Sequence, residues 1–113
     1  MFGRSSRIRL SRDYERLFQY GRSFHTPYLT LKTVQNQQDL NRFGIVVSNK
    51  VDKRAVVRNK MKRRLRAAAR KYEPAFTKRG VDCAFFAKKE VLTLSSEELS
   101  ENVETLLKKA KLL

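Results

Sequence analysis

Hydrophobic residues recur along this chain with two different spacings, and the longest regular pattern is helical. Between residues 57 and 72, the apolar positions are separated by four, four, three and four residues: Val57, Met61, Leu65, Ala68 and Tyr72. This is the spacing of one face of an α-helix. The helix should begin near Arg54 or Ala55 and end before Glu73, because Pro74 disfavours helical geometry at the preceding residue.

Two further helices are predicted, one near each end of the chain. In the first, Tyr14, Leu17 and Phe18 share one face. Ser11 is its expected N-cap, and Gly21 is expected to end it as a C′ glycine after about Tyr20. Leu17 is assigned to the core, whereas Tyr14 and Phe18 are candidates for either the core or a binding surface.

The second of these helices should run from a capping box to the C-terminus. Ser95 and Glu98 have the spacing of that motif. Apolar residues with helical spacing follow at Leu99, Val103, Leu106, Leu107 and Ala110. Upstream of the first helix, Ile8 and Leu10 are candidate hydrophobic anchors in a basic segment without a clear pattern.

Three segments predict β-strands. Residues 28–34 alternate, with Leu29 and Leu31 on one side and Tyr28, Thr30 and Lys32 on the other. Residues 43–48 and 81–87 are nearly continuous apolar runs, and the first of them is typical of a strand covered on both faces. Residues 35–41 are polar and suggest a hairpin loop. The resulting order, α-β-β-α-β-α, predicts a single small α+β domain over residues 1–113.

Positive charge is the main feature of the composition. The chain has 26 Lys and Arg against 11 Asp and Glu, a formal net charge of +15. This self-repulsion opposes folding, so a polyanionic partner is expected, with nucleic acid ahead of an anionic membrane or an acidic protein. Residues 53–72 contain no acid, and their cations lie on both sides of the apolar strip. One flank carries Arg58, Asn59, Lys62, Arg63, Arg66 and Arg70, and the other carries Lys60, Arg64 and Lys71.

The residues themselves suggest no active site and no metal site. The acidic residues are scattered, and the four glycines are too far apart to form a phosphate-binding loop. His25 has no recognisable partner and is assigned a structural role. Cys83, the one cysteine, excludes an intrachain disulfide and is expected to be buried. With no apolar signal segment at the N-terminus, we expect a soluble, cytoplasmic binding protein.

Single-stranded nucleic acid would be bound by arginines that pair with phosphates and by aromatic rings that stack on bases. Tyr14, Phe18 and Tyr28 are the aromatic candidates. A membrane-surface helix fits less well, because the predicted basic helix offers Met61, Leu65 and alanines rather than Trp or Phe.

Residues 44–66 resemble the signature of the bacterial ribonuclease P protein subunit. In that family a strand ending in Ser-Lys-Lys leads through a short loop to Ala-Val-x-Arg-Asn-Arg-x-Lys-Arg-x-x-Arg-Glu on a helix. Here the helix reads Ala-Val-Val-Arg-Asn-Lys-Met-Lys-Arg-Arg-Leu-Arg over residues 55–66. Residues 9–21 are similar to the family's opening motif, and Val81-Asp82 matches its Asp-bearing strand start. The resemblance covers nearly the whole chain.

The resemblance implies a fold like the second domain of ribosomal protein S5, with a left-handed β-α-β crossover through the basic helix. It also implies the accessory subunit of an endonuclease, the ribozyme that removes the 5′ leader from precursor tRNA. The family's RNA subunit holds the Mg²⁺ ions and the catalytic groups. Its protein subunit binds that RNA and the leader, so neither DNA nor a membrane is an expected partner.

The predicted RNA-binding residues are Tyr14, Phe18, Tyr28, Lys50, Lys53, Arg54, Arg58, Asn59, Lys60, Lys62, Arg63, Arg66 and Arg70. No residue is predicted to be catalytic or to bind a metal. Three positions depart from the family motif. Asn49 replaces a lysine, Lys60 replaces an arginine and so loses its planar fork, and Ala67 replaces a glutamate. The alternative is a ribosomal or generic RNA-binding protein without a catalytic partner.

Overall fold

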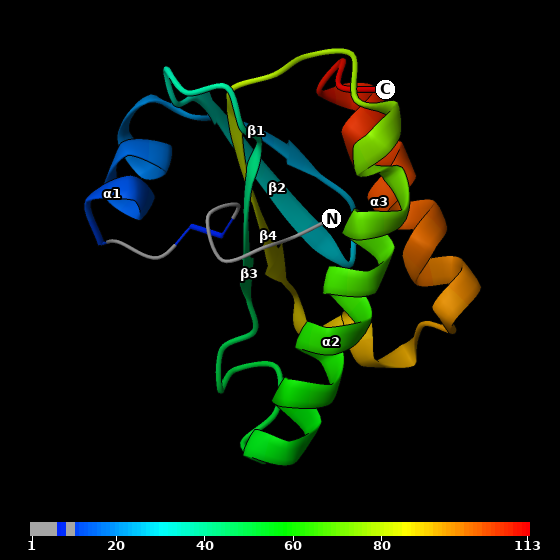
Figure 1. Ribbon diagram of the computed structural model, residues 1–113. Helices are drawn as coiled ribbons and strands as arrows, with labels where there is room; N and C mark the ends of the chain where they lie inside the picture. The colour runs from blue at the N-terminus through cyan, green and yellow to red at the C-terminus, as the bar shows by residue number, and fades with distance from the viewer. Residues whose placement is uncertain (1–6, 9–10) are drawn as a thin grey trace.

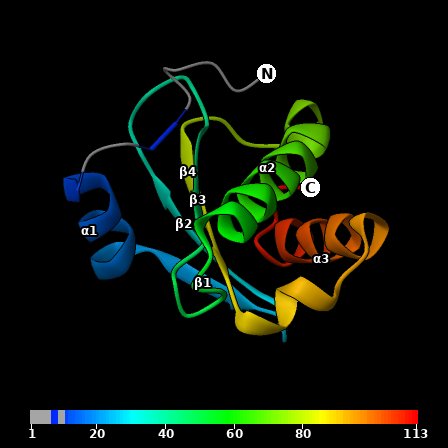
Figure 2. The same cartoon turned by 90° about the horizontal axis from the view of Figure 1, so that it is seen from below.

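The computed structural model describes residues 7–8 and 11–113. A four-stranded mixed sheet separates helix α1 on one side from helices α2 and α3 on the other (Figures 1 and 2). The elements are α1 (Ser11–Tyr20), β1 (Arg22–His25), β2 (Leu29–Gln35), β3 (Arg42–Val46), α2 (Ala55–Tyr72), β4 (Val81–Ala87) and α3 (Ser96–Lys109), with 3₁₀ turns at Glu73–Ala75 and Lys89–Thr93. The predicted α+β class is confirmed.

The three predicted helices are present. Helices α1 and α2 lie within about one residue of their expected bounds, whereas α3 ends at Lys109 rather than at the C-terminus. The capping box of α3 is complete: the Ser95 hydroxyl accepts from the Glu98 N–H at 3.1 Å, and the Glu98 carboxylate accepts from the Ser95 N–H at 2.9 Å. Ser11 is the first residue of α1 rather than its cap. The expected anchor Ile8 is buried, whereas Leu10 lies outside the described residues.

Gly21 ends α1 for a different reason from the one predicted. Its φ is not positive, so it is not a left-handed C′ glycine. Instead, a Cβ at this position would overlap the carbonyl oxygen of Leu17, and it would lie 3.1 Å from the carbonyl oxygen of Thr33. Gly21 is therefore required mainly because a side chain would overlap the last turn of α1 itself, and secondarily because β2 lies close.

The sheet contains one strand more than was predicted. Strand β1 pairs antiparallel with β2, with Phe24 opposite Leu31. Its sequence, Arg-Ser-Phe-His, has a single apolar residue, Phe24, which packs against the main core, while the other three residues are exposed. So short a strand leaves no alternating apolar pattern to recognise. The turn between the two strands is held by the Thr26 hydroxyl, which accepts from the N–H groups of Tyr28 and Leu29 at 3.1 and 3.0 Å.

The strand order is β1-β2-β4-β3, so the predicted hairpin between β2 and β3 is wrong. Strand β4 lies between them, antiparallel to β2 and parallel to β3. The connection from β3 through α2 to β4 is thus a β-α-β unit between neighbouring parallel strands; its left hand stays a prediction. Strand β3 is at the sheet edge, and β4 is the strand most deeply covered on both faces.

Apolar side chains form a core on each face of the sheet. The main cluster fills the space under α2 and α3 and includes Leu31, Leu65, Phe85 and Leu106. Cys83 belongs to it, and burial raises the pKa of its thiol, so the thiol is unreactive at neutral pH. A smaller cluster under α1 consists of Ile8, Leu17 and Ala84, with partly buried Tyr14, Val34 and Phe86 packed against it.

A buried polar network ties α1 to the sheet. The carboxylate of Asp82 is 1% exposed and accepts from Nε and Nη2 of Arg42 at 2.8 and 2.7 Å. The Asn36 amide donates to the same carboxylate at 2.8 Å, and Arg42 also lies 3.4 Å from Asp13 on α1. These hydrogen bonds raise the pKa of the Arg42 guanidinium and link three elements that are distant in sequence.

Candidate nucleic-acid interface

Helix α2 carries the buried apolar strip that its spacing predicted. Met61, Leu65 and Ala68 are buried, and Val57 and Tyr72 are half-buried at the two ends of the helix. Most of its other side chains are cations that face solvent. The first turn of α2 contains no acidic residue, so the partial positive charge of the helix N-terminus adds to this basic surface.

The two flanks of α2 face different neighbours. Nη2 of Arg64 donates to the carbonyl oxygen of Leu94 at 2.8 Å, which places that flank against the segment leading into α3. Arg66, on the opposite flank, lies beside β3 and α1. The cations on the Arg66 flank are therefore the ones that share a surface with the aromatic residues of α1.

Arg66 lines a cavity of about 90 Å³ together with Arg7, Tyr14 and Gly44, here called the guanidinium pocket. Burial, and then repulsion by Arg7 and Arg70, lowers the pKa of the Arg66 guanidinium. Nε of Arg7 is buried and has no hydrogen-bond partner among the described residues. Two guanidinium groups held this close repel each other, so an anion such as a phosphate would be bound favourably between them.

Tyr14 lies between the small core cluster and the guanidinium pocket. It is half-buried, and its hydroxyl lies against Gly44, where a Cβ would overlap it. Burial, and secondarily the charge of Asp82, raises the pKa of Tyr14. The hydroxyl is protonated at neutral pH, as in any tyrosine with an unlowered pKa, and can donate to an anion.

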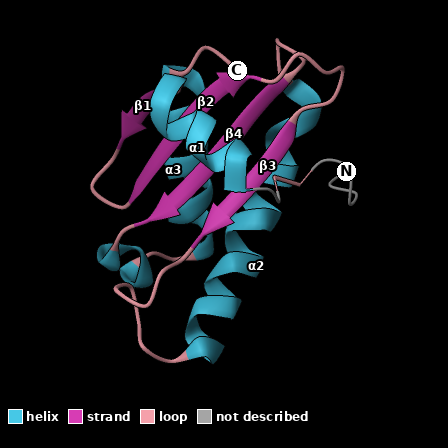
Figure 3. Ribbon diagram, turned by 90° about the vertical axis from the view of Figure 1, so that its left-hand side faces the viewer, coloured by secondary structure: helices cyan, strands magenta, loops and turns pink. Residues whose placement is uncertain are grey.

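Phe18 is an exposed aromatic residue of α1 that lies beside a cation of the sheet. It is 59% exposed, with its ring 5.5 Å from that of Phe86 and 5.4 Å from Nζ of Lys32. Lys32 and Phe86 belong to the sheet face on which α1 lies, and no other helix of the described residues covers this face (Figure 3). A base could thus stack on Phe18 while Lys32 stays close to its backbone.

The loop before α2 is ordered by its own ion pair. Asp52 accepts from the Arg54 N–H at 2.8 Å and from its guanidinium at 3.1 and 3.0 Å. These bonds lower the pKa of Asp52 to about 2. Nη1 of Arg58 donates to the carbonyl oxygens of Asp52 and Lys53 at 3.1 and 2.8 Å, so Arg58 holds the loop as well as carrying charge.

The structure places most of the predicted residues at the surface around α1 and α2, with Lys60 on the Arg64 flank. The flank of Asn59, Lys62, Arg63, Arg66 and Arg70 continues from Arg58, and Lys50, Lys53, Arg54 and Lys60 are exposed around the start of α2. Tyr28 is the exception. It precedes β2 by one residue, so strand alternation does not orient it, and it packs against the main core instead.

Two residues of this surface were missed by sequence reasoning. Lys32 could have been included, because the alternation of β2 already placed it opposite Leu29 and Leu31. Arg7 gave no local signal: it lies in an unpatterned segment and reaches the site through a single parallel bridge with Phe43.

Asp13 and Asp82, scattered in the sequence, both form an ion pair with Arg42. No group of three or more His, Cys, Asp or Glu side chains in the described part of the chain is arranged to hold a metal ion. His25 is exposed, with Nδ1 3.0 Å from the Thr30 hydroxyl. Within the same residues, no helix is both long and apolar enough to span a membrane.

Comparison with known proteins gives one consistent result. The family model described as Ribonuclease P matches residues 2–111. The ribonuclease P protein component of Syntrophomonas wolfei is 34% identical, and the match covers 99% of this chain and 92% of that relative. The structure is similar to the RNase P protein of Staphylococcus aureus (TM-score 0.85, 28% identity, 95% and 96% of the two chains). It is also similar to that of Thermotoga maritima (TM-score 0.81, 31% identity, 91% and 96% of the two chains).

Proposed function

This chain belongs to the ribonuclease P protein family, the protein components of an endoribonuclease of tRNA processing, and we propose from this premise that it binds two RNAs at one surface. The first is the catalytic RNA of ribonuclease P. The second is the 5′ leader of precursor tRNA, whose removal the protein assists.

The observation that carries the proposal is the meeting of basic and aromatic groups from distant parts of the chain. The Arg66 flank of α2 borders the guanidinium pocket, and α1 presents the exposed ring of Phe18 beside Lys32. Cations for phosphates next to a ring for bases are what single-stranded RNA requires. The leader is a single strand, so we assign it to the side of the surface that includes α1.

In this proposal the protein positions the leader, and the catalytic RNA performs the chemistry. The Mg²⁺ ions of the cleavage reaction would be held mainly by the RNA subunit. The protein's contribution would be binding energy and orientation, since fixing the leader places the scissile phosphate relative to the RNA-bound metal ions. The cations that extend along α2 beyond the guanidinium pocket, including Arg63 and Arg70, are assigned to the catalytic RNA.

Two of the motif departures bear on this assignment. Lys60 is exposed near the start of α2, where it supplies charge but no bidentate contact. Ala67 lies on the α3 side of the helix, in a hollow that it shares with Arg64 and Lys71. Neither residue lines the guanidinium pocket, so both departures would affect contacts outside it.

The proposal is tested by adding the purified protein to a bacterial ribonuclease P RNA at low Mg²⁺ concentration and measuring leader removal from precursor tRNA. We expect the protein to restore cleavage that the RNA alone does not perform at that concentration. If the protein binds the RNA without restoring cleavage, it is a generic RNA-binding protein and the proposal fails.

The role of α1 is tested with paired variants of Phe18. Phe18→Ala should weaken binding of precursor tRNA to the holoenzyme by about 1–3 kcal/mol and leave mature tRNA binding unchanged, because only the precursor carries the leader. Phe18→Tyr keeps a ring and is the matched control. Equal losses for precursor and mature tRNA would show that Phe18 does not contact the leader.

A further inference from the structure

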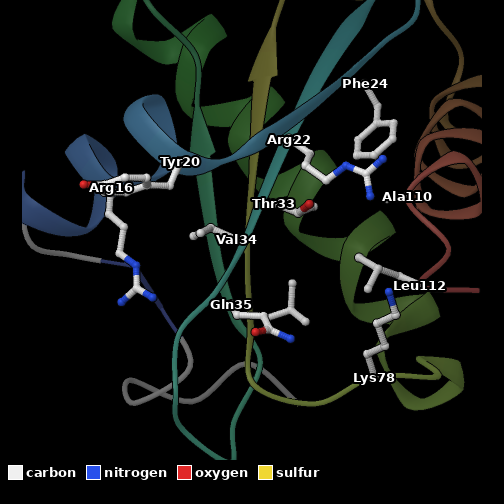
Figure 4. A pocket seen from close by; sticks show the side chains of 11 residues that line it. Arg16, Tyr20, Arg22, Phe24, Thr33, Val34, Gln35, Lys78, Ala110 and Leu112 are labelled. Carbon is white, nitrogen blue, oxygen red and sulfur yellow. The ribbon is translucent and has the colours of Figure 1, made fainter.

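A second cavity lies beside β1 and the end of β2. Its volume is about 430 Å³, and no residue of α2 lines it. Arg16 and Tyr20 of α1 form one side, and Lys78 and Leu112 form the other, with Gln35 between them (Figure 4). We call it the end pocket.

The end pocket exists because two neighbouring strands have unequal lengths. The pairing of β1 with β2 ends at Arg22 and Thr33, whereas β2 continues to Gln35 in its pairing with β4. At this end of the sheet the chain turns from α1 into β1 at Gly21, so the edge of β2 beyond Thr33 is left without a neighbouring strand. The end pocket occupies that space, and Val81 of β4 also lines it.

Three cations and no carboxylate line the end pocket. Arg16 is half-buried, Lys78 is exposed, and the guanidinium of Arg22 lies 5.9 Å from the centre of the Phe24 ring. In the described part of the chain, none of these three side chains forms an ion pair. Uncompensated like charges around one hollow favour an anionic ligand.

The end pocket also offers groups that suit a base. Tyr20 is 68% exposed, the most exposed tyrosine or phenylalanine in the described chain. Burial of the Tyr20 ring contributes little to the stability of the fold, and the flat ring lies at the opening of the end pocket. Gln35 is exposed at the floor of the pocket, and its amide can donate to and accept from the edge of a base.

We propose that the end pocket is a second RNA-contact site, in which one nucleotide stacks on Tyr20 while the phosphates on either side of it are bound by Arg16 and by Lys78. This inference rests on the proposed function, because it assumes that the protein binds RNA. The end pocket lies at the β1–β2 edge and α2 lies toward the β3 edge, so RNA would be contacted on two separate sides of the protein.

Proximity to RNA is tested with a cleaving probe attached to single introduced cysteines. Because Cys83 is fully buried and the pKa of its thiol is raised, a thiol-reactive iron chelate would label only the introduced residue. Tyr20→Cys reports on the end pocket, Asn59→Cys on α2, and Glu101→Cys on the acidic outer face of α3. Each labelled protein is assembled with ribonuclease P RNA and precursor tRNA before radical cleavage is started.

We expect cuts from Tyr20→Cys at RNA positions different from those cut from Asn59→Cys, and background cutting from Glu101→Cys. The RNA that is cut identifies whether the catalytic RNA or the precursor fills the end pocket. Background cutting from Tyr20→Cys together with strong cutting from Asn59→Cys would overturn this inference alone. Background cutting from all three positions would instead overturn the proposed function.

The contribution of the end pocket to binding is tested by measuring affinity for the RNA that the cleavage experiment identifies. Tyr20→Ala should weaken binding at least about 5-fold, which corresponds to the lower end of the range for one stacked base, and Tyr20→Phe should restore it. Arg16→Ala should lower the slope of log affinity against log salt by about one phosphate contact. Lys108→Ala, which removes a cation paired with Glu104 at 3.1 Å, is the matched charge control. Wild-type affinity and salt slope in both pocket variants would refute the inference.

Discussion

Replacing Arg42 by methionine tests whether the buried polar network holds α1 against the sheet. Methionine keeps much of the side-chain length and removes the guanidinium. Asp82, 1% exposed, would then lose two of its three hydrogen bonds, the pair of 2.8 and 2.7 Å from Arg42. Only the 2.8 Å bond from Asn36 would remain to compensate the buried carboxylate.

The size of the effect follows from the burial of the pair. Two unit charges about 4 Å apart interact by about 4 kcal/mol at an effective dielectric constant of about 20. Removing one partner of a buried pair costs about 3–5 kcal/mol, because the other charge is left uncompensated. Since the Arg42 side chain is 14% exposed, we expect the lower value, about 3 kcal/mol. That is a large part of the roughly 5–15 kcal/mol stability of a small domain.

Urea denaturation followed by circular dichroism measures this loss. With a slope of about 1–3 kcal/mol per molar urea, the midpoint should fall by about 1–3 M. Arg54→Met is the matched control, because it breaks an Arg–Asp pair in which the arginine is 74% exposed, and it should leave the midpoint nearly unchanged. In a double-mutant cycle, Asp82→Asn should cost much less in the Arg42→Met background than alone. Equal midpoints for Arg42→Met and Arg54→Met would refute the reasoning.

Three other predictions concern single residues. Gly44→Ala should lower the melting temperature through a loss of about 1–3 kcal/mol, because its Cβ would overlap the Tyr14 hydroxyl, and adding Tyr14→Phe should recover part of the loss; no recovery would mean that the overlap is relieved elsewhere. Ser95→Ala should cost about 1 kcal/mol in urea denaturation by removing the cap of α3, and Ser95→Asp should retain most of the stability. Folding lowers the pKa of Asp52 to about 2, so its stabilising effect is complete above the unfolded pKa of about 4 and is lost as the pH falls toward 2. The difference in melting temperature between wild type and Asp52→Asn should therefore disappear over that interval, and a difference that is constant from pH 5 to pH 2 would contradict this account.

Features determined by neighbouring residues were predictable from the sequence. The apolar strip of α2, the capping box of α3 and the excess of positive charge all depend on spacing within one or two helical turns or on composition. The basic flank around Arg66 is set by the same helical period. These features predict an α+β domain that binds an anionic polymer, and the motif in residues 44–66 indicates the family.

The tertiary structure decided what depends on pairing between distant segments. The insertion of β4 between β2 and β3 removed the predicted hairpin, and Tyr28, one residue before β2, packs partly buried against the main core. Arg7 lines the same cavity as Arg66 because it forms a parallel bridge with Phe43 of β3, and the end pocket forms because β1 is shorter than β2. Helical periodicity is fixed by backbone geometry within a few residues. Strand order and register instead depend on which distant segments bury the most apolar surface together, and no local pattern records that choice.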